Sequence, residues 1–211
     1  MSKYSAKQAY QNPESPKGYL SRRHYIGLLG RYRLWQERRV FDAIFAGLPR
    51  GLSALDCPCG PGRWLPHLAK YCRSIIAMDV SAAMVDHARS AAANLPVQVT
   101  VQVGDAEQLP LDDGAVDVVY SFALMKHLSP ILQENVLREF ARVGKTAVVC
   151  SFAILTMRHK WLGARRLPAD SHPVTWKQLL TMSDRCGLKV ERAVRCSTPV
   201  GFEQLVYLNK P

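Results

Sequence analysis

Long apolar runs are missing from this sequence of 211 residues. The most apolar stretch, residues 146–157, is too short to span a bilayer and contains Ser and Thr. The first eight residues hold no apolar segment of the kind found in secretory signals. The six Cys residues form neither a disulfide framework nor the paired spacings of a zinc site. We therefore expect a soluble, cytoplasmic, single-domain protein without a membrane span.

Acidic residues are scarce relative to basic ones, with 17 Asp and Glu against 28 Lys and Arg and a formal charge of +11. The excess is uneven along the chain. Residues 1–50 carry a charge of +7, residues 51–150 carry −2, and residues 151–211 carry +6. A basic surface concentrates anions such as phosphates, nucleic acid or acidic lipid headgroups. Such a surface can also serve solubility alone.

Apolar periodicity predicts strands and helices in alternation after a polar N-terminal arm. Ser81 is a candidate N-cap, and Gly187 is a candidate residue for ending a helix. Alternation of this kind favours a doubly wound α/β fold, with a mainly parallel sheet covered on both faces and an antiparallel C-terminal hairpin. The seven expected strands are 52–56, 74–79, 97–103, 116–120, 146–152, 189–194 and 202–208, and the expected helices are 31–48, 64–71, 81–93, 130–142 and 175–186.

A glycine-containing turn follows the first expected strand, in the segment from Asp56 to Gly62. Two glycines there let the backbone turn sharply and lie close to a ligand. A nicotinamide-binding fingerprint needs a third glycine at position 65, where Leu65 stands, and Asp56 would repel a pyrophosphate. A metal site at Cys57 and Cys59 lacks a second pair of ligands.

Four ordered motifs resemble those of class I S-adenosylmethionine-dependent methyltransferases, in the branch of the ubiquinone and menaquinone biosynthesis methyltransferases. The first is Asp56-x-x-x-Gly60-x-Gly62, and the others are residues 77–85, 104–110 and 117–122. The flanks of the chain match poorly, and the Pro-Gly-Gly turn usual before the fifth strand is absent. The resemblance implies a Rossmann-like fold and S-adenosylmethionine as the cofactor.

The resemblance also implies roles for single residues. The two glycines would admit the methionyl part of the cofactor, with Asp56 near its ammonium group. Asp79 would accept hydrogen bonds from the ribose hydroxyls, and Asp105 from the adenine amino group. The alternative for each of these carboxylates is a turn or N-cap. The complete set of expected cofactor-binding residues is Asp56, Gly60, Gly62, Asp79, Val80, Met84, Asp105, Ala106 and Ser121.

His127 follows the fourth expected strand and is the candidate catalytic base, because an imidazole titrates near neutral pH. A histidine that packs or caps at a helix start is the alternative. Metal-dependent relatives carry an acidic residue before this histidine, and Lys126 stands here instead. We therefore expect no metal site.

The two basic flanks are expected to cover the acceptor. We divide the single domain into an N-terminal arm and helical cover (1–50), a cofactor-binding core (51–150), and an acceptor-side insertion with the hairpin (151–211). The expected acceptor is a small or lipid-linked molecule bearing phosphate or carboxylate groups. An RNA acceptor and a non-catalytic, methyltransferase-like binding subunit are the alternatives. The expected substrate-binding residues are Tyr19, Arg22, Arg23, Tyr25, Arg158 and Arg165.

Overall fold

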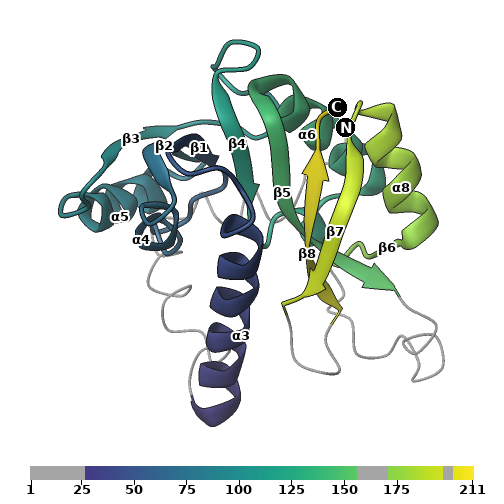
Figure 1. Ribbon diagram of the computed structural model, residues 1–211, viewed down its shortest axis with the longest axis horizontal. Coiled ribbons are helices and arrows are strands. Elements are labelled where there is room, and N and C mark those ends of the chain that lie inside the picture. Colours follow the sequence, from purple (N-terminus) through teal and green to yellow (C-terminus); the bar gives the residue numbers. More distant parts are fainter. Residues whose placement is uncertain (1–26, 156–170, 197–201) are drawn as a thin grey trace.

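The computed structural model describes residues 27–155, 171–196 and 202–211 (Figure 1). Its sheet has the strand order β3-β2-β1-β4-β5-β8-β7, with β6 paired to β5 off this path. The strands are β1 (Leu52–Asp56), β2 (Cys72–Asp79), β3 (Gln98–Val103), β4 (Val116–Ser121), β5 (Gly144–Leu155), β6 (Val174–Thr175), β7 (Lys189–Arg195) and β8 (Glu203–Asn209).

Strands β1 to β5 run parallel, whereas β8 pairs antiparallel with both β5 and β7. The predicted α/β fold with a C-terminal hairpin is therefore confirmed. The two-residue strand β6 was not predicted, because a segment so short shows no periodicity. The helices are α3 (Gly27–Phe45), α4 (Leu65–Leu68), α5 (Ala82–Ala92), the 3-10 turn η2 (Met125–His127), α6 (Pro130–Val143) and α8 (Trp176–Arg185).

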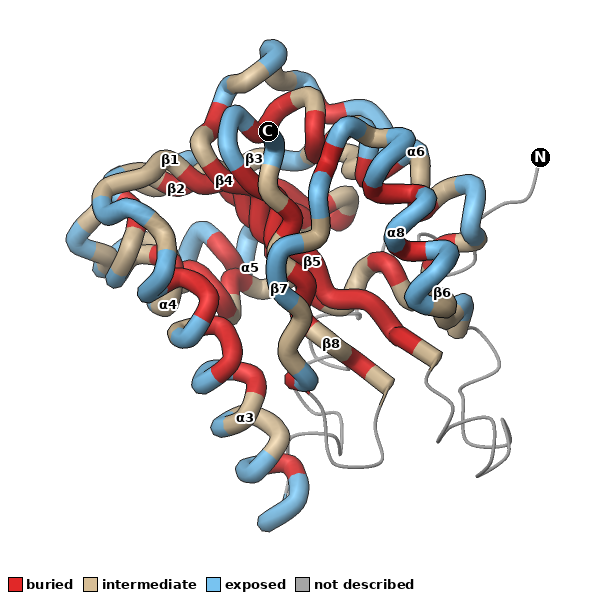
Figure 2. The backbone as a smooth tube through the Cα atoms, turned by 45° about the vertical axis from the view of Figure 1, so that its right-hand side comes forward, coloured by how far each residue is buried: buried red, intermediate tan, exposed pale blue. Residues whose placement is uncertain are grey.

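Each face of the sheet is buried against helices, so the central strands are apolar on both sides (Figure 2). On β1, Ala54 belongs to the cluster that contains the α3 residue Phe41, and Leu55 belongs to the cluster that contains the α6 residue Phe140. This alternation follows from the two-residue period of a strand. On the α3 side, Phe41 stacks on Phe45 at 4.2 Å between ring centroids.

The predicted caps occur where expected. The backbone N–H of Met84 donates to the Ser81 side chain, which caps α5. Thr175 and Gln178 form a capping box on α8, and Gly187 follows that helix with φ +69°. Within the described ranges, no helix has both the length and the apolar character needed to cross a membrane.

Candidate functional site

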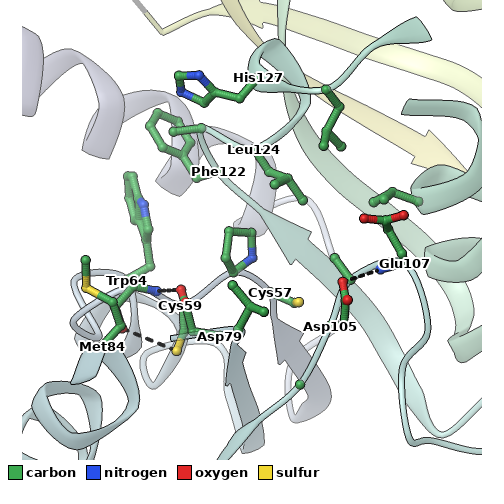
Figure 3. A pocket seen from close by; sticks show the side chains of 18 of the residues that line it. Cys57, Cys59, Trp64, Asp79, Met84, Asp105, Glu107, Phe122, Leu124 and His127 are labelled. Carbon is green, nitrogen blue, oxygen red and sulfur yellow. Dashed lines mark hydrogen bonds between the residues drawn. The ribbon is translucent and has the colours of Figure 1, made fainter. Parts of the chain in front are cut away.

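A pocket of about 910 Å³, part of it open to solvent, lies beyond the carboxyl ends of β1, β2, β3 and β4 (Figure 3). This is the edge at which open α/β sheets bind ligands. The residues lining the pocket are Cys57, Pro58, Cys59, Gly60, Arg63, Trp64, Asp79, Val80, Met84, Gly104, Asp105, Ala106, Glu107, Phe122, Ala123, Leu124, His127, Leu128 and Val136.

Asp79 ends β2 and is 5% exposed, with its side chain in the lower part of the pocket in Figure 3. One carboxylate oxygen accepts from the backbone N–H of Gly60 at 2.9 Å, and the other accepts from that of Ser81 at 2.9 Å. Burial raises the pKa of Asp79, and the backbone hydrogen bonds oppose this shift. Asp79 therefore fixes the glycine loop against the second strand while it faces the pocket.

The two glycines of the loop meet different surroundings. Gly60 lines the pocket with φ +52°, and a Cβ added to it would have no heavy atom within 4 Å. Gly62 has φ +83° and faces α5, where an added Cβ would lie 2.9 Å from the Cβ of Ala91 and 3.1 Å from the Cα of Ala88. Gly62 does not line the pocket. Its lack of a side chain is thus required by packing, whereas Gly60 leaves room beside the loop for a ligand.

Asp56 is fully buried beneath the pocket and does not line it. Neither of its carboxylate oxygens has a hydrogen-bond partner among the described residues. Burial, and then the charge of Asp79, raise the pKa of Asp56 well above its ordinary value, and the charge of Arg63 lowers it. The hydroxyls of Tyr120 and Ser121 on β4 are buried and equally unpartnered within the described chain. Ser121 also lies outside the pocket lining.

Asp105 follows β3 on the other side of the pocket from Trp64 (Figure 3). It forms a short turn in which its carboxylate accepts from the backbone N–H of Glu107 at 3.1 Å. Gly104 precedes this turn, and a Cβ there would lie 2.8 Å from the Sδ of Met78. Gly104 and Glu107 also line the pocket, although the sequence analysis did not select them.

His127 lies in η2 and faces the pocket from the end opposite Asp79 (Figure 3). The segment that carries it is held at several points. Ala123 has φ +63°, and its backbone N–H donates to the Ser151 hydroxyl at 2.7 Å. The side chain of Gln133 donates to the carbonyls of Met125, at 2.8 Å, and Leu128, at 3.1 Å. These contacts give His127 a defined position at the pocket wall.

A charge network around two buried carboxylates, which sequence analysis missed, links α3, β8 and η2 to the pocket residue Arg63. Glu37 on α3 is 1% exposed and pairs with Arg33 and Arg63, both at 2.9 Å. Arg33 also reaches Glu203 on β8 at 3.2 Å, and Glu203 pairs with Lys126 at 3.2 Å. Burial opposes ionisation of Glu203, but the charges of Lys126 and Arg33 prevail and hold its pKa below the ordinary value.

Arg63 is the member of this network that lines the pocket. Its guanidinium lies 4.7 Å from the ring centroid of Trp64 and 5.2 Å from that of Phe122. Contacts of this kind hold a cation against aromatic faces. Its partner Glu37 lies 26 residues away in the sequence, so no local pattern indicated the pair.

The predicted site residues fall into three groups. The pocket collects Gly60, Asp79, Val80, Met84, Asp105, Ala106 and His127. Asp56, Gly62 and Ser121 lie beside it, outside the lining. The six predicted substrate-binding residues lie outside the described residues: Tyr19, Arg22, Arg23, Tyr25, Arg158 and Arg165.

The cysteines of the loop have no feature of a metal or nucleophile site. Burial raises the pKa of the Cys57 and Cys59 thiols far above the ordinary value, which keeps them protonated. In the described part of the chain, no group of three or more His, Cys, Asp or Glu side chains could hold a metal ion.

The pocket fits S-adenosylmethionine, which carries a sulfonium and an ammonium group. The lining includes the carboxylates of Asp79, Asp105 and Glu107, and the buried Asp56 lies beneath it without a hydrogen-bond donor in the described chain. Several carboxylates around one pocket favour the binding of a ligand with positively charged groups. The open space beside Gly60 admits a ligand close to the backbone.

Comparisons with known proteins agree with this geometry. Residues 54–147 match the family described as "Methyltransferase domain". The malonyl-[acyl-carrier protein] O-methyltransferase of Yersinia pestis is 31% identical over 105 residues, which cover 50% of this chain and 37% of that protein. The ajmaline N-methyltransferase of Rauvolfia serpentina is 36% identical over 138 residues, which cover 58% of this chain and 46% of that protein. The chain thus spans less than half the length of these curated relatives.

Among solved structures, the magnesium protoporphyrin IX methyltransferase of Synechocystis PCC 6803 with bound S-adenosylhomocysteine superposes with a TM-score of 0.77. Its sequence is 16% identical, and the match covers 98% of this chain and 99% of that one. At this identity the likeness concerns the fold. The matched domain, the four motifs, the fold and the pocket all resemble those of class I S-adenosylmethionine-dependent methyltransferases.

Proposed function

We propose that this protein transfers a methyl group from S-adenosylmethionine to a small or lipid-linked acceptor that bears a phosphate or carboxylate group. The observation that carries the proposal is the pocket, with Asp79 at one end and His127 at the other. S-adenosylmethionine supplies the activated methyl group when bound. The protein then has to align the acceptor, and alignment alone can account for much of the rate of such a transfer.

On this proposal, each cofactor-binding residue contacts a different part of S-adenosylmethionine, according to the chemistry of its side chain or backbone. Asp79 accepts hydrogen bonds from the ribose hydroxyls, because its carboxylate faces the pocket. Asp105 accepts from the adenine amino group, and the Ala106 backbone meets a ring nitrogen. Asp56 compensates the ammonium group from beneath, which would neutralise its buried charge. Val80 and Met84 supply apolar contacts at the pocket wall.

The acceptor end is assigned to the segment after β4. Phe122, Leu124 and Leu128 give this end an apolar wall, and His127 is its titratable group. An acceptor that loses a proton on methylation could deliver it to the imidazole of His127. A carboxylate acceptor would need no base, and His127 would then orient it by donating a hydrogen bond.

The anionic character of the acceptor is supported by the basic flanks of the sequence and by one class of relative. The matched relative from Yersinia pestis is named for O-methylation of a malonyl group, which carries a carboxylate. The division into an N-terminal cover, a cofactor core and an acceptor-side insertion remains part of this proposal, as do the substrate-binding residues of the flanks.

Calorimetric titration with S-adenosylmethionine and with S-adenosylhomocysteine tests the cofactor half of the proposal. We expect micromolar affinity for both. Asp79→Asn should weaken it at least about tenfold, because a charged hydrogen bond contributes about 1.5–3 kcal/mol. The exposed Asp112→Asn is the matched control and should bind as the parent does. Failure of the parent protein to bind either compound would reject catalysis and favour a binding subunit.

A further inference from the structure

The first turns of α3 expose an unusual amount of apolar surface. Leu28 is 85% exposed, Leu29 68%, Tyr32 42% and Trp35 51%. Positions 28, 32 and 35 follow helical spacing, so three of these side chains form one stripe. The buried residues of α3, among them Glu37, Val40 and Phe41, lie on the opposite side of the helix from this stripe by helical spacing. Contiguous apolar side chains on a helix surface mark an interaction site more often than scattered ones do.

Positive charge surrounds this stripe. Arg31 and Arg39 are exposed, and the Arg39 guanidinium lies 5.2 Å from the ring centroid of Trp35. The two carboxylates of α3 do not offset them at the surface. Glu37 is buried in the charge network, and Asp42 is half-buried and accepts from the Tyr71 hydroxyl at 3.0 Å. The exposed side of the helix is therefore apolar and cationic.

The position of α3 relates this surface to the pocket. The helix starts well beyond the strands, on the side where β5 ends (Figure 1). Its carboxyl-terminal half is buried in the core, where Phe41 stacks on Trp64 at 5.2 Å between ring centroids. Glu37, midway along, pairs with the pocket residue Arg63. A flat partner that contacts the start of α3 would thus lie on the pocket side of the molecule.

We propose that this surface docks on an anionic lipid bilayer. Leucine and aromatic side chains enter the boundary between headgroups and acyl chains, and flanking arginines meet anionic headgroups. A nucleic acid would use the arginines and the aromatic rings but gain little from two leucines. The docking surface comprises Leu28, Leu29, Arg31, Tyr32, Trp35 and Arg39. Membrane docking does not depend on the proposed methyl transfer. Its consequence, that the acceptor is lipid-linked, rests on the proposed function.

Sedimentation of the full-length protein with vesicles tests the proposal. Vesicles of phosphatidylcholine with phosphatidylglycerol should bind the protein, and vesicles of phosphatidylcholine alone should bind it much less. Leu28→Glu and Trp35→Glu should each weaken binding about tenfold or more, since each removes a large apolar group that docking would bury. Arg31→Gln should weaken it about fivefold. Ile131→Glu on α6, where Ile131 is 75% exposed, is the matched control and should bind normally.

Other outcomes would overturn the proposal. These are absence of binding to anionic vesicles, equal loss in the Ile131→Glu control, or a self-associated protein that Leu28→Glu converts to a monomer. Binding of a poly(U) RNA that depends on Arg31 but not on Leu28, without vesicle binding, would assign the surface to nucleic acid. Calorimetry with S-adenosylmethionine on the same variants separates the membrane-docking hypothesis from the proposed methyltransferase function. The docking variants should retain the cofactor affinity of the parent protein, whatever that affinity is.

Discussion

Gly62→Ala should destabilise the fold more than alanine at another glycine of similar backbone conformation. Gly62 has φ +83°, and an added Cβ would lie 2.9 Å from Ala91 Cβ, 3.0 Å from Leu65 Cδ1 and 3.1 Å from Ala88 Cα. The left-handed conformation costs an L-residue about 1–2 kcal/mol. Overpacking against neighbours that cannot withdraw adds about 1–3 kcal/mol. The expected loss in the free energy of unfolding is therefore about 2–5 kcal/mol.

Gly187 supplies the matched control. It has φ +69° after α8, and an added Cβ would meet nothing within 4 Å. Gly187→Ala should therefore cost only the conformational part, about 1–2 kcal/mol. The effect of alanine on the unfolded chain is common to both variants and cancels in the comparison. Urea unfolding followed by circular dichroism should show a difference of about 1–3 kcal/mol between them, with equal m-values.

Equal losses in the two variants would refute the packing argument. Gly60→Ala adds a second test, because Gly60 has φ +52° with open space beside it and lines the pocket. This variant should resemble Gly187→Ala in stability but bind S-adenosylmethionine more weakly. If Gly62→Ala lost cofactor affinity while its stability matched that of Gly187→Ala, Gly62 would act on the cofactor and not on α5.

Three further predictions concern charged and titratable groups. Glu37→Gln should lower the free energy of unfolding by about 2–4 kcal/mol in urea denaturation, because it removes the buried charge with which Arg33 and Arg63 both pair. Glu134→Gln, whose arginine partners are 54% and 63% exposed, should cost less than about 1 kcal/mol, and equal effects would contradict the argument. His127→Ala should lower kcat about a hundredfold at unchanged cofactor affinity if it acts as the base, and full activity would exclude that role. Cofactor affinity, measured by calorimetry across pH, should rise as pH increases through the raised pKa of Asp56, because only the ionised carboxylate attracts an ammonium group. Asp56→Asn should lose this dependence, and a flat profile in the parent protein would contradict the assignment.

Local sequence patterns predicted the sheet because its strands are apolar or alternating in short runs bounded by turns. The strand 52–56 was predicted at its observed bounds, and the cap of Ser81 follows from local chemistry. The start of α3 was missed by four residues. Apolar periodicity identifies a helix through its buried face, and Leu28 and Leu29 are exposed. Periodicity therefore predicts helices well only where they contact the core.

The site was predictable where one segment carries the chemistry and not where distant segments meet. Asp79 ends one strand and Asp105 comes just after another, so their place at the carboxyl edge of a parallel sheet could be inferred from the sequence. Glu37 and Glu203 are 166 positions apart and share Arg33 as a partner, a relation that no local pattern contains. Gly62 is a second example. It has no room for a side chain because α5, a later segment of the chain, packs against it.

The charge network also changes how the basic flanks are interpreted. From the sequence, every arginine in residues 1–50 adds to the positive charge available to an acceptor. In the structure, Arg33 of that segment pairs with the two buried carboxylates Glu37 and Glu203, so its charge is compensated within the protein. Compensated cations attract an external anion weakly. Support for an anionic acceptor therefore has to come from arginines outside such networks, and the exposed Arg31 and Arg39 of α3 meet that condition in the described chain.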